Sequence, residues 1–457
     1  MKKYLKYVVL LGILWGSVTA EAQRSYRYRV RFTDKAQTEF SLERPQEFLS
    51  ERALARRSRQ DLKVDSTDLP VCSSYIQQLV NLGSRCVLTS KWNNTALMEV
   101  TDTLVADRFL EKPFVESVLR VWVKSEMVFP RDKERKRKVT NKMMKKTHHY
   151  GVSADQIRIH VGDSLHMAGF RGEGMHVAVI DAGFFNVDVI KLFKGVDILG
   201  TRDFVNPNSD IFEEHDHGLK VFSCLAANRP KVMVGTAPKA SYWLLRSEDN
   251  DTEQLSEEDC WAAAIEFADS VGVDVVNTSL GYYEFDDPSG NYQYRDLNGK
   301  KAMISRSADM AGRKGILVVC SAGNAGSSAW KKISPPADAE HVLTVGAVSK
   351  QGINALFSSL GNTADGRVKP DVMAVGFLSA VAGDDGNTAF GNGTSFSSPI
   401  FCGLATCLWQ ACPWLKVDEL IELIRKSSDR YEYPDNVFGY GVPNVWKAYQ
   451  EGLKMKK

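Results

Sequence analysis

The chain has 457 residues, of which 44% are hydrophobic and 25% are charged, with 34 glycines and 15 prolines. This ordinary globular composition excludes a collagen-like, coiled-coil or wholly disordered chain, and the length predicts two or three domains. The formal net charge of +2 argues against a general nucleic-acid-binding protein, so we expect no nucleic-acid partner.

The first 22 residues have the pattern of a secretory signal peptide. Three lysines precede a short apolar run at residues 7–15, and Ala20-Glu21-Ala22 provides a small-x-small cleavage motif. No later segment has the roughly 18 uncharged apolar residues that a membrane helix requires. We therefore expect an exported protein, periplasmic or extracellular, without a membrane span.

Residues 23–123 predict a small α+β domain. Residues 26–32 alternate strictly between apolar and basic side chains, which is typical of a half-buried strand. We expect helices over residues 45–60, 74–82 and 102–110, and further strands over residues 85–90, 96–101 and 115–123. Apart from the extra helix at residues 45–60, this order is β-α-β-β-α-β, as in a ferredoxin-like sandwich.

Residues 124–150 are charged and almost free of branched aliphatic side chains, so we expect a solvated basic linker there. Within it, residues 131–146 hold nine basic and two acidic side chains. Residues 23–130 have a net charge of +3, and residues 147–457 have a net charge of −10. The chain thus has a basic N-terminal part and an acidic C-terminal part. The linker between them contains Lys and Arg, which offer sites for proteolysis.

From residue 151 onward, apolar strand-like runs alternate with helical stretches. The runs cover residues 176–180, 241–245, 273–276, 316–320, 342–345 and 372–374, and the helical stretches include residues 217–227, 256–270 and 301–314. This alternation predicts an α/β domain over residues 151–457, with a mainly parallel sheet between helices. In such sheets, functional residues follow the carboxyl ends of strands or begin the next helices.

Three side chains at such positions are candidates for catalysis. Asp181 directly follows the apolar run at residues 176–180, and His217 lies where a helix begins. Ser395 follows a glycine-rich stretch at the start of another helix. A serine hydroxyl is a weak nucleophile unless an imidazole accepts its proton, and a carboxylate fixes the tautomer of that imidazole. Asp, His, Ser is one of the known chain orders of such triads.

Seven motifs resemble those of subtilisin-like serine proteases, in the family's order, over residues 174–444. The triad motifs are Val177-Ala-Val-Ile-Asp181-Ala-Gly183, His217-Gly218 and Gly393-Thr394-Ser395-Phe-Ser-Ser-Pro399. The other motifs are Ser321-Ala-Gly-Asn324, Asn277-Thr-Ser279-Leu280-Gly281, Gly235-Thr-Ala-Pro238 and Gly439-Tyr-Gly441-Val-Pro-Asn444. Each motif alone is modest, whereas seven in order make the resemblance specific.

The resemblance implies a three-layer α/β fold and a serine endopeptidase that works through an acyl-enzyme intermediate on polypeptide substrates. By matching position, Asp181 orients the imidazole, His217 is the general base and then the general acid, and Ser395 is the nucleophile. Asn324 and the Ser395 amide would stabilise the oxyanion. Ser279, Leu280 and Gly281 would bind the substrate backbone.

Several positions depart from the family pattern. Lys220 replaces the second histidine of the His motif, Phe222 is bulky where a small residue is usual, and Phe396 replaces the methionine after the nucleophile. These changes indicate a divergent branch. Because all three triad residue types are present, we favour an active enzyme, and a catalytically impaired binding protein on the same scaffold stays open as an alternative.

Residues 23–123 have the element order of the propeptides of secreted subtilisin-like proteases. The basic charge of this region would favour its docking on an acidic catalytic domain. We expect a zymogen that is released by cleavage within residues 124–150, and a permanent accessory domain is the alternative. The eight cysteines show no metal-ligand spacing, and their pairing stays open.

A metal-dependent hydrolase is a further alternative. Residues 213–217, Glu-Glu-His-Asp-His, offer metal ligands, but His341 is the only histidine that follows them. We expect no cofactor for catalysis and no metal in the catalytic site, and we expect a monomer. Structural calcium stays open, although no contiguous calcium-binding loop occurs.

Overall fold

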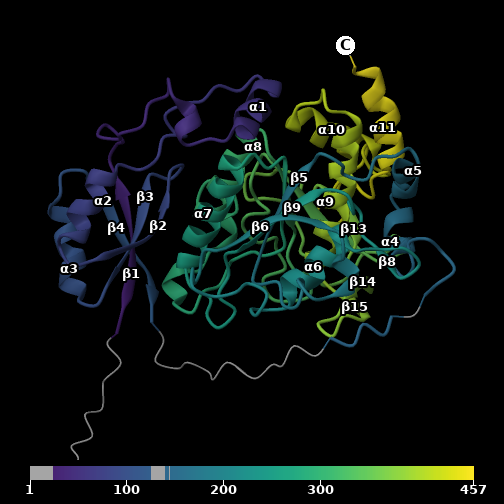
Figure 1. Cartoon of the computed structure of the whole chain (residues 1–457), viewed down its shortest axis with the longest axis horizontal. Coiled ribbons are helices and arrows are strands. Elements are labelled where there is room, and N and C mark those ends of the chain that lie inside the picture. Colours follow the sequence, from purple (N-terminus) through teal and green to yellow (C-terminus); the bar gives the residue numbers. More distant parts are fainter. Residues whose placement is uncertain (1–23, 125–138, 144, 457) are drawn as a thin grey trace, which may run out of the picture.

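The computed structural model describes residues 24–124, 139–143 and 145–456. An N-terminal unit, residues 24–124, lies beside a larger α/β domain (Figure 1). The predicted signal peptide falls on residues 1–22, outside the described residues. Within the described ranges, no helix combines the length and the apolar character needed to cross a membrane.

The N-terminal unit contains a four-stranded antiparallel sheet, as the sequence predicts. Its strands, in the spatial order β2-β3-β1-β4, are β1 (Tyr26–Phe32), β2 (Arg85–Ser90), β3 (Thr95–Val100) and β4 (Val115–Val123). Helices α2 (Ser73–Val80) and α3 (Thr103–Asp107) and the 3-10 turn η2 (Arg108–Glu111) complete this body. Val30, Phe32, Leu79, Met98 and Phe109 are fully buried between the sheet and these helices.

The predicted helix at residues 45–60 is two separate elements, the 3-10 turn η1 (Pro45–Glu47) and helix α1 (Glu51–Arg59). Ser50 separates them because its backbone is extended and its side chain accepts a hydrogen bond from the Ala53 amide, which caps α1. The Ser50 amide donates to the Ser270 carbonyl oxygen at 2.9 Å, so α1 begins against the α/β domain. Figure 1 shows α1 beyond the body, near α8 and α10.

The α/β domain is built on a seven-stranded sheet in which every pair of neighbouring strands is parallel. The spatial order is β13-β12-β11-β10-β5-β9-β6. The strands are β5 (His176–Asp181), β6 (Asp197–Asp203), β9 (Ser241–Arg246), β10 (Val275–Thr278), β11 (Leu317–Ser321), β12 (Val342–Val348) and β13 (Val372–Val375). The predicted mainly parallel sheet is therefore confirmed. The edge strand β6 was not predicted, because its sequence is polar.

Helices cover both faces of this sheet, which gives three layers. Helices α6 (His217–Ala226) and α9 (Thr394–Ala411) pack on one face, and α7 (Ser256–Ser270) and α8 (Met303–Arg313) pack on the other (Figure 1). Along β5, Val177 and Val179 join the core under α6 and α9, whereas Ala178 and Ile180 join the core under α7 and α8. A strand buried on both faces is uninterruptedly apolar, which is how β5 stands out in the sequence.

Smaller elements surround the sheet. They are α4 (Ala154–Arg158), α5 (Gly162–Met167), η3 (Lys191–Phe193), η4 (Pro288–Gly290), η5 (Tyr294–Asp296), α10 (Val417–Ser427), α11 (Val445–Lys454), the hairpin of β7 (Asn228–Arg229) and β8 (Met233–Val234), and the hairpin of β14 (Ser379–Ala382) and β15 (Thr388–Gly391). The β14–β15 hairpin leads directly into α9, so it borders the segment that carries Ser395.

The linker predicted at residues 124–150 is not solvated throughout. The Thr140 amide donates to the Asp385 carbonyl oxygen at 2.8 Å, and the Lys146 amide donates to the Lys231 carbonyl oxygen at 2.6 Å. Val139 and Met143 pack against the core of the α/β domain, because this half of the segment supplies apolar side chains among its lysines. Residues 125–138 lie outside the described residues.

Candidate active site

The candidate catalytic residues meet at the carboxyl edge of the sheet. Asp181 is the last residue of β5, Ser279 directly follows β10, and Asn324 lies three residues beyond β11. His217 begins α6, and Ser395 is the second residue of α9. Parallel strands place their carboxyl ends at one edge, so positions far apart in the chain converge there.

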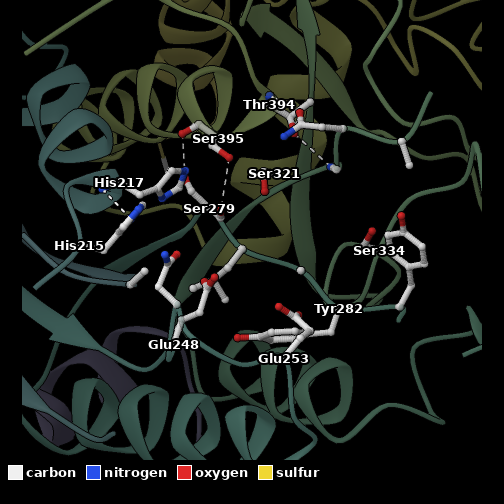
Figure 2. A pocket seen from close by; sticks show the side chains of 18 of the residues that line it. His215, His217, Glu248, Glu253, Ser279, Tyr282, Ser321, Ser334, Thr394 and Ser395 are labelled. Carbon is white, nitrogen blue, oxygen red and sulfur yellow. Dashed lines mark hydrogen bonds between the residues drawn. The ribbon is translucent and has the colours of Figure 1, made fainter. Parts of the chain in front are cut away.

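All of the predicted site residues except Asp181 line one cavity of about 380 Å³. His217, Ser279 and Ser395 lie together at one end of this cavity in Figure 2. Leu280, Gly281 and Asn324 also line it. Asp181 lies behind His217 and is completely buried.

Asp181 and His217 form a close pair. His217 Nδ1 lies 2.7 Å from Asp181 Oδ1, which also accepts the Ala182 amide at 2.8 Å. Burial lowers the pKa of His217, but the charge of Asp181 and the hydrogen bond to it outweigh this and raise the pKa to about 9. With Nδ1 bonded to the carboxylate, Nε2 is the imidazole atom left to exchange a proton in the cavity.

Ser395 is held by a reciprocal contact with Ser279. The Ser395 hydroxyl donates to the Ser279 carbonyl oxygen at 3.2 Å, and the Ser279 hydroxyl donates to the Ser395 carbonyl oxygen at 3.0 Å (Figure 2). Between the described residues, no hydrogen bond joins the Ser395 hydroxyl to His217. A change of the Ser395 rotamer redirects the hydroxyl without moving the backbone, and both side chains face the same cavity.

Asn324 has a fixed amide orientation. Its Oδ1 accepts the Thr394 amide at 2.8 Å and the Thr394 hydroxyl at 3.0 Å. Because Oδ1 is the acceptor in both contacts, Nδ2 is left to donate to another group. The adjacent start of α9 presents backbone N–H groups and the positive end of the helix dipole, which favour negative charge at this position.

The departures from the family pattern lie away from these atoms. Lys220 of α6 pairs with Asp216, the residue just before this helix, with Nζ 3.1 Å from Oδ2. Phe222 is fully buried and stacks on Phe193 with ring centroids 5.0 Å apart. Phe396 is the exception, because its ring centroid lies 6.2 Å from that of His217.

One wall of the cavity is acidic, which was not predicted from the sequence. Glu248 and Glu253, from the loop after β9, line it opposite Ser395 (Figure 2). Burial and nearby Asp181 raise the pKa of Glu248 to about 7, and burial and Glu248 raise the pKa of Glu253 to about 8. The sequence did contain a signal for these two residues, because both follow the carboxyl end of an expected strand.

The geometry does not favour a metal site at residues 213–217. Among the described residues, two groups of three side chains have the spacing of metal ligands, and neither group contains His215 or His217. These groups are Asp309, Glu340 and His341, and Glu248, Glu253 and Glu257. The sequence left the pairing of the eight cysteines open. All eight are free thiols, and the described parts of the chain contain no disulfide bond.

Comparisons with known proteins identify the family of both parts of the chain. A model of the subtilase family matches residues 172–441, and a model of the peptidase S8 propeptide domain of Bacteroidota matches residues 27–141. Subtilisin DY from Bacillus licheniformis is 30% identical over 295 residues, which cover 63% of this chain and 95% of that protein. Subtilisin NAT from Bacillus subtilis subsp. natto is 30% identical over 307 residues, which cover 66% of this chain and 71% of that protein. A thermophilic serine proteinase from Bacillus sp. strain AK1 is 31% identical over 278 residues, or 60% of this chain and 61% of that protein.

Proposed function

This chain belongs to the subtilase family and is a serine endopeptidase, and from that premise we propose that Asp181, His217 and Ser395 are its catalytic triad. The contact that carries the proposal is the hydrogen bond from His217 to buried Asp181 beside Ser395. It gives the imidazole one defined tautomer, with Nε2 available to the serine.

Acylation begins when Ser395 Oγ attacks the carbonyl carbon of the scissile peptide bond. His217 Nε2 accepts the hydroxyl proton, and Asp181 stabilises the resulting imidazolium through Nδ1–H. The same Nε2–H then protonates the leaving amine, so the peptide bond breaks and Ser395 keeps the acyl group. A water molecule then attacks the acyl carbon while His217 Nε2 accepts its proton. The ester bond to Ser395 Oγ breaks as Nε2–H returns that proton to Oγ, which releases the acid product and restores the hydroxyl.

The tetrahedral oxyanion would be stabilised by Asn324 Nδ2 and the Ser395 amide. Thr394 supports this role, because its amide and hydroxyl hold Asn324 Oδ1 and leave Nδ2 free to donate. Fixed donors are worth more than mobile ones, since they need no reorganisation as charge develops.

Ser279, Leu280 and Gly281 would pair with an extended substrate backbone along one wall of the cavity. A side-chain carbon at Gly281 would lie 3.0 Å from the Pro335 carbonyl oxygen, so this wall has little room for anything but glycine.

The propeptide match and the basic linker support synthesis as a zymogen that is exported and then cut within the linker. Residues 139–143 and 145–150 contact the α/β domain, which favours a cut before residue 139. N-terminal sequencing of protein recovered from outside the cytoplasm tests both steps. An uncut chain that runs from residue 23 to the C-terminus would contradict maturation, and an intact residue 1 would contradict removal of a signal peptide.

A catalytically impaired binding protein is the second candidate, since the Ser395 hydroxyl is bonded to Ser279 rather than to His217. Mass spectrometry after treatment with a fluorophosphonate decides between the two. An active triad gives one adduct on Ser395, which Ser395→Ala abolishes and Ser321→Ala, a control in the same cavity, leaves intact. No adduct on the matured protein would favour the binding protein.

A further inference from the structure

Arg246 is a buried cation at the carboxyl edge of the sheet, and it takes no part in the proposed reaction. It is the last residue of β9 and is 1% exposed. Strand β9 lies between β5 and β6, and Arg246 is the register partner of Asp181 at the end of β5 and of Asp203 at the end of β6. Three neighbouring strands therefore end in a row of charged residues, in the order Asp203, Arg246, Asp181.

The Arg246 side chain lies on the face of the sheet that carries α6. Successive side chains of a strand point to opposite faces, and Tyr242 and Leu244 of β9 belong to the core under α6 and α9. Arg246, two residues beyond Leu244, therefore points to the same face. It shares this face with Asp181 and with His217, which begins α6.

The first contact of Arg246 is with the turn that follows Asp181. Its Nε donates to the Ala182 carbonyl oxygen at 3.0 Å, and the next residue, Ser247, donates its amide to the Asp181 carbonyl oxygen at 3.1 Å. The Ala182 amide in turn donates to Asp181 Oδ1, the oxygen that binds His217 Nδ1. Arg246 thus fixes the residue whose amide orients the Asp181 carboxylate.

The second contact is with the segment that leads into α6. Arg246 Nη2 lies 3.4 Å from Oε2 of Glu214, three residues before His217. This segment packs directly on the turn after β5, because a side-chain carbon at Gly183 would lie 2.4 Å from the His215 amide nitrogen. One guanidinium therefore binds both of the segments that carry the carboxylate and the imidazole of the proposed triad.

The third contact anchors the guanidinium itself. Arg246 Nη1 lies 2.9 Å from Asp203 Oδ2, and the Asp203 side chain is 3% exposed. Asp203 Oδ1 accepts the Val205 and Asn206 amides at 2.8 Å, so this carboxylate has a fixed place at the end of β6. Because the donors of an arginine form a rigid planar fork, fixing Nη1 also fixes the directions of Nε and Nη2.

Arg246 also faces the acidic wall of the cavity. Its Nη2 lies 3.9 Å from Oδ1 of Asp249, the neighbour of Glu248. Burial and the charge of Asp181 raise the pKa of Glu248 to about 7, whereas the charges of His217 and Arg246 oppose that rise. The guanidinium thus connects the acidic wall with the segments that carry the proposed triad.

We propose that Arg246 is a positioning residue of the endopeptidase, which sets the relative placement of Asp181 and His217 through the backbone segments that carry them. The proposal rests on the proposed triad. A displacement of about 1 Å at a catalytic group can cost about 10²-fold in rate, so a side chain that holds two such segments together acts on kcat. The same three contacts also stabilise the fold, and the two effects must be measured separately.

The test compares Arg246→Met with Lys369→Met in the matured protein. Lys369 is a buried cation at the opposite edge of the sheet, where it donates to the Val342 carbonyl oxygen at the start of β12 and pairs with Asp371 at 2.7 Å. Both variants should lose stability, because each removes one member of a buried ion pair. Only Arg246→Met should lower kcat, by about 10²-fold, with KM changed less than about threefold. Equal losses of kcat in the two variants, or no loss in Arg246→Met, would overturn the proposal.

Arg246→Lys tests whether the geometry of the guanidinium is needed. A lysine keeps the charge but offers one ammonium group in place of the planar fork, so it cannot make the three contacts at once. We expect its kcat to stay at least about tenfold below that of the unmodified enzyme. Full kcat in this variant would show that charge alone suffices, which overturns the positioning role.

A spectroscopic measurement needs no turnover. In the Ser395→Ala background, the proton between His217 Nδ1 and Asp181 Oδ1 should give a downfield ¹H NMR resonance, because the hydrogen bond is short and its acceptor is charged. Arg246→Met should shift or broaden this resonance, and Lys369→Met should leave it in place. An unchanged resonance in Arg246→Met would overturn the proposal.

Should Arg246→Met not fold, Asp203→Asn decides instead, because it keeps the guanidinium and removes the charge that anchors Nη1. The resonance of the His217 proton must then shift or broaden, and an unchanged resonance would overturn the proposal. Asp181→Asn distinguishes this proposal from the proposed function. Full activity of Asp181→Asn would overturn the triad and the role of Arg246 together, whereas a loss in Asp181→Asn without a loss in Arg246→Met would overturn the role of Arg246 alone.

Discussion

His217 Nδ1 lies 2.7 Å from Asp181 Oδ1, and this single contact ties the end of β5 to the start of α6. Asp181 is completely buried, and its other oxygen, Oδ2, has no hydrogen-bond partner among the described residues. The negative charge of the carboxylate is therefore directed mainly at the imidazole. The pair controls both the tautomer and the pKa of His217, and the pH dependence of the enzyme follows from it.

We expect activity to rise with pH toward the alkaline range. The pKa of His217 is raised to about 9, and only the neutral imidazole accepts the Ser395 proton, so kcat/KM should fall as pH decreases through that value. A pH profile of kcat/KM on a neutral peptide measures this directly. A profile that is flat from pH 6 to 10 would contradict the role of His217 as the base.

Asp181→Asn should lower kcat by about 10³- to 10⁴-fold, because the amide no longer fixes the productive tautomer or stabilises the imidazolium. The remaining activity should show its acid limb at lower pH, since the charge that raises the pKa of His217 is gone. Asp188→Asn, at an exposed position outside the cavity, serves as the control and should leave both quantities unchanged.

The acidic wall of the cavity also acts on His217. The charge of Glu248 raises the pKa of His217, so Glu248→Gln should move the acid limb of the kcat/KM profile to lower pH. Glu253→Gln is a matched control in the same cavity, because Glu253 is not among the main contributors to that pKa. An equal shift in both variants would mean that the effect is not specific to Glu248.

The same two carboxylates should select substrates. Peptides with Lys or Arg beside the scissile bond should be cleaved with higher kcat/KM than matched peptides with Asp or Glu. The difference should grow as pH rises through about 7 and about 8, the pKa values of Glu248 and Glu253, because both then become charged. In the variant Glu248→Gln/Glu253→Gln, the preference for Lys or Arg should no longer increase with pH. If the preference still increased with pH, these two carboxylates would not be its cause.

Asn324→Ala should lower kcat by about 10²- to 10³-fold with little change in KM, as expected for a donor that acts in the transition state. The side chain is exposed, so the melting temperature should stay close to that of the unmodified protein. Thr394→Val, which removes one of the two donors to Asn324 Oδ1, should give a smaller loss. A large increase in KM with unchanged kcat would instead indicate ground-state binding.

Much of the candidate site could be predicted from the sequence, because each proposed triad residue ends a strand or begins a helix whose apolar pattern is clear. Strand β5 is apolar on both faces and ends at Asp181, so the sequence indicates only one position for the carboxylate. Strand β6 was missed because an edge strand needs only one partner, and its residues are partly exposed and polar. The break between η1 and α1 was missed because the Ser50 cap competes locally with a continuous helix.

Long-range pairing explains the remaining gaps. Nothing near Arg56 in the sequence indicates that its partner is Asp269, more than two hundred residues away. The opposite net charges of the two halves of the chain predict that they attract each other, but they do not predict which side chains meet. The segment at residues 45–60 was therefore predicted as a helix of the N-terminal domain, whereas the arginines of α1 bind the α/β domain.

Asp269→Asn should destabilise the full chain more than any surface substitution. Asp269 is fully buried and neutralises Arg56, Arg57 and Lys91, which all belong to the N-terminal unit, so the amide would leave buried cations without their counter-charge. The expected loss is about 3–5 kcal/mol of unfolding free energy. Burial alone would raise the pKa of Asp269, but these cations outweigh it and hold the pKa below the usual value of 3.8, so the stabilising effect is complete above that pH and disappears as the pH falls further. Denaturant titration of the Ser395→Ala background measures the loss, and Asp287→Asn, at an exposed pair with Arg120, should change it by less than about 0.5 kcal/mol. Equal stability of the two variants would show that the ion pairs of Asp269 do not stabilise the folded chain.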